Sequence, residues 1–156
     1  METFTSKQIQ KLAGVSHMQV SRWTELGIIE PFEDARGRGR VRRFSKENLV
    51  EAMICKQLAS LHMETSVIWE VLNWLRAKLY PDEKPQFSAL QALMLHPGKE
   101  PAYALLWWEG GSSKPYGRTL VAAKDIGKEI LGWGAQLGIV LNLTSIIQEA
   151  EALASK

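Results

Sequence analysis

An arginine-rich run at residues 36–43 is the part of this sequence whose chemistry is easiest to interpret. Its five arginines, which are separated by two glycines and a valine, are Arg36, Arg38, Arg40, Arg42 and Arg43. Guanidinium groups at this density can neutralise the phosphates of a nucleic acid or enter a narrow minor groove, where the potential is most negative. By itself the run is equally consistent with a solvated loop. Its role must therefore be judged from the helices and turns that the neighbouring sequence predicts.

A second group of polar residues surrounds the start of a helix that we predict over residues 17–26. The group consists of Ser16, His17, Gln19 and Arg22. Glutamine can bond adenine through two atoms, and arginine can do so with guanine or can bind a phosphate. Trp23 is more typical of a core residue, or of one packed beside the DNA backbone, than of a base reader. We include Trp23 and Thr5 among the expected DNA-binding residues.

Residues suited to catalysis or metal binding are scattered along the chain. The histidines His17, His62 and His96 lie far apart and have no partner at ligand spacing. Cys55 is the only cysteine, which excludes disulfides and multi-cysteine metal sites within one chain. We expect it to be a packed thiol and not a redox sensor. Without a nucleophile motif or a phosphate loop, the sequence predicts no enzyme, no metal and no cofactor.

Three helix starts near the N-terminus share one local pattern. Thr5, Ser16 and Ser45 each carry a hydroxyl that can accept a hydrogen bond from an early helical N–H. Apolar residues flank each of them and can clamp the entry angle of the chain, and Gln8 and Gln19 add a reciprocal bond in the first two cases. The pattern predicts helices over residues 6–13, 17–26 and 46–61, with Gly14 and Gly27 ending the first two. Apolar residues at helical spacing between Ile68 and Leu79 predict a fourth helix over residues 66–79.

Two short helices joined by the tight turn at residues 14–16 indicate a helix-turn-helix, whose second helix enters the major groove. The small core between them is expected to contain Ile9, Leu12, Val15, Val20 and Leu26. Residues 32–44 then follow where a β-hairpin wing belongs. Gly37 and Gly39 would form its tip, while Val41 and Phe44 would anchor its return.

Composition fits a globular protein with a real core. The chain has 156 residues, 46% of them hydrophobic, and a net charge of only +2. The positive charge is concentrated, since residues 1–60 hold ten basic and seven acidic side chains. No apolar run is long enough for a membrane helix, and the first residues do not resemble a secretory signal. We therefore expect a cytoplasmic protein that contacts no membrane.

The second half predicts a small α+β domain, so the whole chain is mainly α. Pro81 and Pro85 indicate a linker between a DNA-binding domain at 1–80 and a second domain at 86–156. The expected elements of the second domain are a helix at 86–95, strands at 102–108, 118–123 and 139–143, a helix from Asp125 to about 136, and a final helix to about 154. Ser145 and Gln148 resemble a capping box for that final helix.

Aromatic residues in the second domain allow two interpretations. Adjacent residues of a strand face opposite sides, so Trp107 and Trp108 cannot both face the same side of the strand. Either they are core or interface residues, or they contribute with Tyr103 and Tyr116 to an effector pocket or a self-association surface.

Residues 4–75 resemble the N-terminal module of the MerR family of transcription regulators. The resemblance is carried by residues 4–16 for the first helix and turn, 23–31 for the aromatic, glycine and proline pattern, 42–49 for the wing-to-helix signature and 61–68 for the start of the fourth helix. It implies a winged helix-turn-helix and a DNA-binding transcription regulator.

Three features depart from that family. Ser21-Arg22 stands where an Arg-Tyr pair is common, Pro81 and Pro85 interrupt the long helix that pairs subunits, and metal-sensing cysteines are absent. Val20–Trp23 is also similar to phage excisionase and AlpA-like modules, which share the fold.

We therefore expect a sequence-specific regulator that binds double-stranded DNA on the bacterial nucleoid. A homodimer on a near-palindromic site is the default, since one small module buries little surface, and the second domain would bind an effector or mediate dimerisation. The first alternative is an excisionase-like architectural factor of a mobile element. The second is an interaction protein whose basic loop binds another partner.

Overall fold

The computed structural model of the chain describes residues 2–33, 41–77, 87–95, 98–108, 117–132 and 137–155. Helices predominate in these ranges, so the expectation of a mainly α chain is confirmed. The chain divides into two compact units, residues 1–91 together with 148–156, and residues 92–147. This division differs from the expected boundary at 80–86, because residues 87–91 and the end of the chain belong with the first unit.

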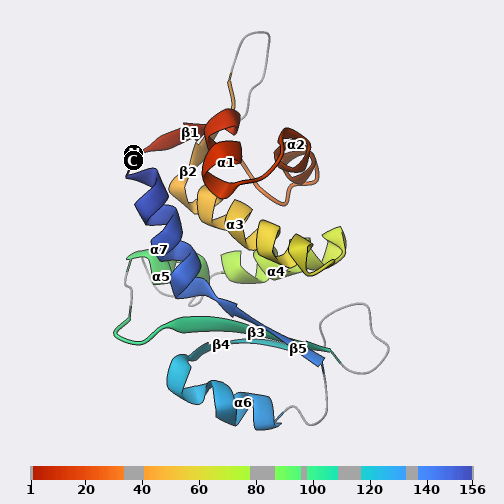
Figure 1. The fold of residues 1–156 in the computed structure, drawn as a ribbon, viewed down its shortest axis with the longest axis vertical. Helices are drawn as coiled ribbons and strands as arrows, with labels where there is room; N and C mark the ends of the chain where they lie inside the picture. Colours follow the sequence, from red (N-terminus) through yellow and green to blue (C-terminus); the bar gives the residue numbers. More distant parts are fainter. Residues whose placement is uncertain are drawn as a thin grey trace. The chain divides into compact units, whose positions relative to one another are not determined.

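The first unit is built from short strands and helices (Figure 1). Its elements are β1 (Thr3–Thr5), α1 (Ser6–Ala13), α2 (His17–Glu25), β2 (Arg43–Ser45), α3 (Lys46–Ser60), α4 (Thr65–Arg76), the start of α5 (Ala89–Leu95) and the second half of α7 (Leu143–Ala154). Helix α1 packs against both α2 and α3, and α3 packs against α4. The predicted helices at 6–13, 17–26, 46–61 and 66–79 are thus present, with ends that differ by no more than three residues.

The predicted caps position these helices. The Ser16 hydroxyl accepts from the Gln19 N–H at 3.2 Å, and the Gln19 side-chain oxygen accepts from the Ser16 N–H at 2.9 Å. Thr5 and Gln8 form the same reciprocal pair. Ser45 does so as well, with the side chain of Asn48 as its partner. Each pair satisfies two N–H groups at a helix start.

A left-handed glycine turn ends α2. Gly27 has a φ of +66°, the Ile28 N–H donates to the Trp23 carbonyl at 2.8 Å and the Gly27 N–H to Thr24 at 3.1 Å. This is the Schellman arrangement, in which the residue after the glycine packs on the last turn of the helix. Ile28 and Trp23 are accordingly buried. Leu26 is 50% exposed, so its predicted place in the core is wrong, because the turn directs Ile28 inward instead.

A two-stranded antiparallel pair, β1 with β2, adds to the elements expected from the sequence. Phe4 pairs with Phe44 and Thr5 with Arg43, and both phenylalanines are buried. Beyond it, Glu33 and Arg43 exchange two backbone hydrogen bonds, at 3.1 and 3.0 Å, as at the base of a hairpin. The tip expected at Gly37 and Gly39 lies outside the described residues. Val41 is 58% exposed and therefore does not anchor the return, a role that Phe44 fills alone.

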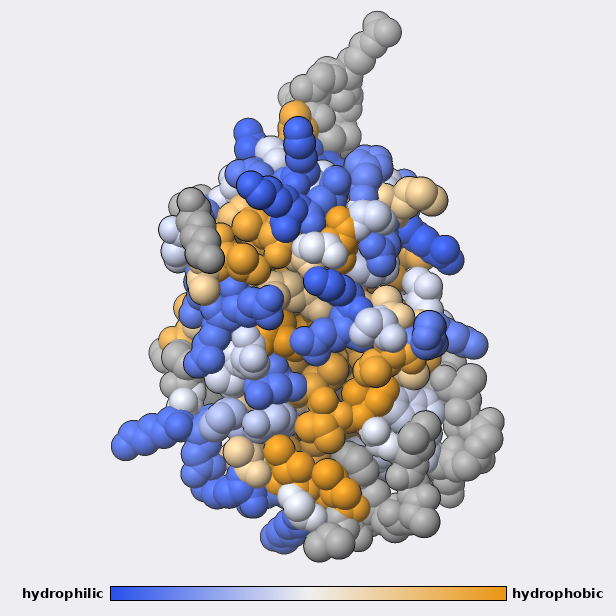
Figure 2. Space-filling view, in the orientation of Figure 1, coloured by the Kyte–Doolittle hydropathy of each residue, from blue (hydrophilic) through white to orange (hydrophobic). Residues whose placement is uncertain are grey.

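The core of the first unit centres on α3. Every residue from Asn48 to Cys55 is buried, because α1, α4 and β2 all pack against this helix. Ile9, Val15 and Val20 are buried as expected, and Leu12 is half-buried. On the face drawn in Figure 2, hydrophilic and hydrophobic residues are mixed over the region of α1 and α3.

The second unit contains a three-stranded antiparallel sheet in the order β4-β3-β5. Strands β3 (Ala102–Trp108), β4 (Gly117–Ala122) and β5 (Leu137–Asn142) match the three predicted strands to within two residues. The unit also contains the turn η1 (Ala123–Asp125) and α6 (Ile126–Gly132), so the helix predicted from Asp125 starts one residue later and is shorter. These elements confirm a small α+β arrangement in this part of the chain.

Two predicted helix starts in the second half are wrong. Helix α7 begins at Leu143 and not after Ser145, because the side-chain oxygen of Asn142 accepts from the Ser145 N–H at 3.0 Å. Helix α5 begins at Ala89 and not at residue 86. Ser88 and Gln91 bond each other reciprocally there, at 3.1 and 3.0 Å, and form a capping box that the predicted helix start does not include.

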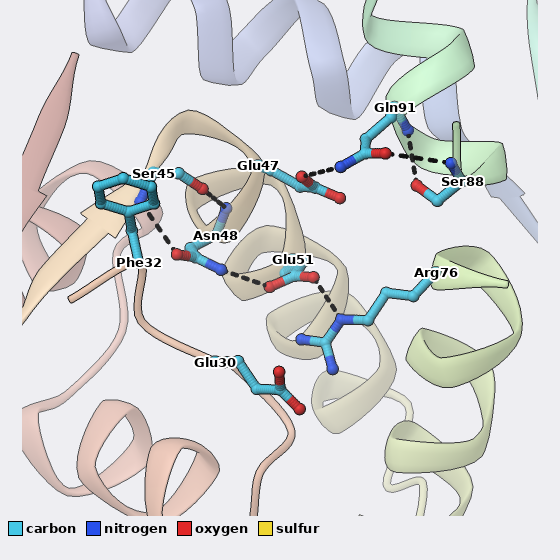
Figure 3. Close-up of a pocket in the computed structure, with 9 residues that line it drawn as sticks. All are labelled: Glu30, Phe32, Ser45, Glu47, Asn48, Glu51, Arg76, Ser88 and Gln91. Carbon is cyan, nitrogen blue, oxygen red and sulfur yellow. Dashed lines mark hydrogen bonds and ion pairs between the residues drawn. The ribbon is translucent and has the colours of Figure 1, made fainter. Parts of the chain in front are cut away.

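A buried polar network ties three segments of the first unit together (Figure 3). Arg76 Nε at the end of α4 donates to Glu51 Oε1 on α3 at 2.6 Å, and its Nη2 donates to the carbonyl of Ile28. The amide of Asn48 donates to the other Glu51 oxygen at 2.9 Å, while its own oxygen caps α3 through Ser45. The network therefore joins the turn after α2, the start of α3 and the end of α4.

Burial governs the electrostatics of this network. Glu51 is only 2% exposed. Burial raises its pKa above the usual value, and the hydrogen bond and charge of Arg76 together with the bond from Asn48 lower it only in part. For Arg76, burial lowers the pKa but the bond and charge of Glu51 outweigh that effect, so the guanidinium is held charged.

Replacing Arg76 with methionine should reduce the free energy of unfolding by about 3–5 kcal/mol, because it leaves a buried carboxylate without its cation. The loss should be smaller at pH 5 than at pH 8. A carboxyl whose pKa is raised in the folded state stabilises below its unfolded pKa, and this stabilisation is lost as the pH rises through the folded pKa. Urea denaturation at the two pH values measures both effects.

The matched control is Lys124→Met, which removes an exposed ion pair with Glu100 of 3.3 Å. Exposed pairs contribute about 0–1 kcal/mol. The double variant Glu51→Leu/Arg76→Met should be more stable than Arg76→Met alone, because no buried charge remains. Equal losses for Arg76→Met and Lys124→Met would contradict the role assigned to the network.

Candidate nucleic-acid interface

Helix α2 presents one polar face and buries the other. His17, Met18, Gln19 and Arg22 are exposed, whereas Val20 and Trp23 are buried. The reader positions expected at His17, Gln19 and Arg22 are therefore all accessible to solvent. Trp23 is 4% exposed, so it anchors the helix to the core and does not present its ring to a ligand.

The capping box limits the hydrogen bonds that the side chain of Gln19 can offer to a base. Its side-chain oxygen already accepts from the Ser16 N–H, and the Ser16 hydroxyl is occupied by the Gln19 N–H. Bidentate bonding to adenine needs both the oxygen and the amide nitrogen of a glutamine. Gln19 can thus offer only its amide nitrogen while the cap is intact.

Thr5 and the surface of α1 lie beside the base of the predicted wing. Thr5 caps α1 and pairs across the strands with Arg43, whose side chain is exposed. Lys7 and Lys11 stand one helical turn apart on α1 and line, with Thr5, an open hollow of about 520 Å³. The site expected from the sequence does not include these two lysines, although their i, i+4 spacing was available as a signal.

The remaining arginines of the run are only partly described. Arg42 is half-buried and Arg43 exposed. Arg36, Arg38 and Arg40 lie outside the described residues, so their predicted role stays a prediction.

A cavity of about 380 Å³ lies over the buried network. Its lining residues, shown in Figure 3, are Glu30, Phe32, Ser45, Glu47, Asn48, Glu51, Arg76, Ser88 and Gln91. Most of their polar groups bond one another, including Gln91 Nε2 to Glu47 Oε2 at 3.0 Å. Walls whose donors and acceptors are satisfied in this way need no ligand to complete them. We therefore assign this cavity a structural role.

The aromatic cluster expected in the second unit is divided by the strand geometry. In the register of β3, Tyr103 and Trp107 lie on one face of the sheet and Trp108 lies on the other. Trp108 is buried, whereas Tyr103 and Trp107 are half-buried. Tyr116 lies outside the described residues.

The described part of the chain shows no metal-binding group, no membrane-spanning helix and no reactive thiol. None of its histidines, cysteine and acidic residues form a group of three that could hold a metal ion. None of the described helices is both long and apolar enough to cross a membrane. Cys55 is fully buried, and burial raises the pKa of its thiol far above the usual value. The thiol is thus kept protonated, as expected for a packed residue.

Cys55 should accordingly resist thiol reagents in the folded protein. We expect no reaction with an aromatic disulfide reagent at pH 8 in buffer and complete reaction of one thiol in denaturant, because the thiolate is the nucleophile. Absorbance of the released thiol measures both states. Rapid labelling of the native chain would contradict the burial described here and restore a sensor role.

Comparison with known proteins concerns the first unit. A family model described as the MerR HTH family regulatory protein matches residues 4–74. The matched segment runs from β1 through α4 and includes the helix-turn-helix. A search of curated proteins finds no match to this chain.

Proposed function

We propose that this chain, whose residues 4–74 match the family model of the MerR HTH regulatory proteins, is a transcription regulator that binds double-stranded DNA sequence-specifically. The observation that carries the proposal is α2, which has an accessible polar face while Val20 and Trp23 fix its opposite side to the core. A helix held this way can enter a major groove without rearrangement of its support.

Arg22 is the leading candidate for base recognition. It is exposed in the second turn of α2, and a guanidinium can bond guanine bidentately. Gln19 and His17 would add single hydrogen bonds to bases or phosphates. Ser16 contributes by holding the helix start.

The wing supplies contacts to the DNA backbone in this proposal. Glu33 and Arg43 close the base of the proposed hairpin through two backbone hydrogen bonds, and the arginine run leads up to Arg43 in the sequence. Arg43 and Arg42, with Arg36, Arg38 and Arg40 further along, would bind phosphates or enter the minor groove. Lys7 and Lys11 on α1 extend the positive surface.

We also propose that the chain acts as a homodimer on a near-palindromic site. Helix α4 ends at Arg76, and Ala77 has an extended backbone conformation. Because the backbone leaves the helical conformation there, α4 does not itself continue into a long pairing helix. The second unit, which would bind an effector or mediate subunit contact, is therefore the proposed source of dimerisation.

Selection of binding sites from a random duplex library with the full chain tests the proposed function. We expect enrichment of one motif with two related half-sites about 10 base pairs apart or a multiple of that spacing. Binding without sequence preference but with strong DNA bending would favour the architectural alternative. The absence of binding to any duplex at low salt would overturn the proposal.

Arg43→Ala should weaken binding to related and unrelated duplexes by a similar factor. Because the variant neutralises one phosphate fewer, the slope of log affinity against log salt should also fall in magnitude by about one. Fluorescence anisotropy between 50 and 300 mM salt measures both. Lys128→Ala removes another exposed charge, from α6 of the second unit, and should leave the slope unchanged, so equal slopes for all three proteins would exclude phosphate binding by Arg43.

Arg22→Ala should instead relax sequence preference. Discrimination against the wrong base at one position of each half-site should fall by about 1–3 kcal/mol, the contribution of a bidentate pair. Repeating the site selection with the variant reveals that position. An unchanged motif would remove Arg22 from the base-reading set.

A further inference from the structure

Met18 is the most exposed large apolar residue in the described part of the chain, at 80%. It lies in the first turn of α2, next to His17 and Gln19. Single exposed apolar residues are common on protein surfaces and carry no meaning by themselves. The position of this one is what distinguishes it.

Helical geometry directs Met18 straight away from the core. At about 100° per residue around the helix axis, Val20 lies about 160° from Met18 in one direction, and Trp23 lies about 140° from Met18 in the other. The two residues that fix α2 to the protein therefore stand almost opposite to it. If α2 enters a groove, Met18 points towards the groove floor, with Arg22 about 40° away on the same face.

The surroundings of Met18 favour an apolar contact over a polar one. The oxygen of neighbouring Gln19 is held in the cap by Ser16. On the same face, the Glu25 carboxylate already accepts from the Ser21 hydroxyl at 2.7 Å. Met18 itself carries no donor and only a weak sulfur acceptor. Among the base edges of the major groove, the apolar feature that it can match is the C5-methyl group of thymine.

We propose that Met18 is a specificity-determining residue that recognises a thymine through its C5-methyl group. This inference rests on the proposed function, since it requires α2 to lie in the major groove. An unbranched, flexible thioether can adjust to the position of that methyl group. Burying one methyl group accounts for a factor of about four in affinity.

The test replaces thymine with uracil, one position at a time, in a duplex selected by the full chain. Uracil keeps the hydrogen-bonding edge of thymine and lacks only the methyl group. We expect one position in each half-site at which uracil weakens binding by the wild-type protein about fourfold. At that position Met18→Ala should bind the thymine and uracil duplexes equally.

Leu26→Ala is the matched control. Leu26 is also an exposed apolar residue at the end of α2, but it lies away from the N-terminal turn, so this variant should retain the full difference between thymine and uracil. Met18 is exposed, so its replacement should not affect folding, which protection of the Cys55 thiol verifies.

The outcomes distinguish the role of Met18 from the proposed function. If the wild-type protein binds its selected duplex but no uracil substitution weakens it, the role of Met18 is overturned and the proposed function stands. If Met18→Ala keeps the fourfold difference, another group reads the methyl and the inference also fails. If no duplex is bound at all, the proposed function itself is wrong.

Discussion

The bonds that Arg76 makes to Glu51 and to the Ile28 carbonyl are the constraint on which the rest of the first unit depends. They fix the end of α4 to the middle of α3 and to the turn that leaves α2. Asn48 extends the network to the cap of α3, and through Ser45 to the end of β2. A buried carboxylate is costly without such partners, so the arrangement is strongly specified. The turn that follows α2 is held by the same network.

Local hydrogen bonds then set the two ends of α2, the proposed recognition helix. The capping box at Ser16 starts α2, and the Schellman turn at Gly27 ends it. Trp23 has two roles. Its carbonyl accepts the hydrogen bond of the Ile28 N–H in the turn, and its buried ring anchors the helix to the core. Stability and recognition compete at Gln19, because the oxygen that caps the helix cannot also bond a base. This competition is why an apolar neighbour such as Met18 becomes important in the proposed interface.

The second unit has a simpler physical basis. Its central strand β3 is apolar on both faces and pairs on both edges, with β4 and β5. Residues 104–106 are consequently buried. The ion pair of Glu151 on α7 with Lys46 on α3, at 2.7 Å, lies within the first unit, because the second half of α7 belongs there. The last helix is thus shared between the two units along the chain.

The sequence alone determined the features whose partners lie within four residues. Thr5 with Gln8, Ser16 with Gln19, and the glycines at 14 and 27 act through bonds inside one turn, so the helix-turn-helix can be recognised without any tertiary structure. The apolar run at 102–108 predicts β3 for a similar local reason.

Only the tertiary structure decided the features that depend on distant partners. The pairing of Phe4 with Phe44 joins segments about forty residues apart, and strands of three residues are too short to show a periodic pattern. In the sequence, Arg76 and Glu51 are indistinguishable from other charged residues, and only folding buries Glu51 beside a half-buried Arg76. The apolar character of Leu26 and Val41 predicts burial, but burial depends on the direction that the turns give these side chains. Bonds within one turn can be read from a short stretch of sequence, whereas burial and long-range pairing arise only when separate segments pack together.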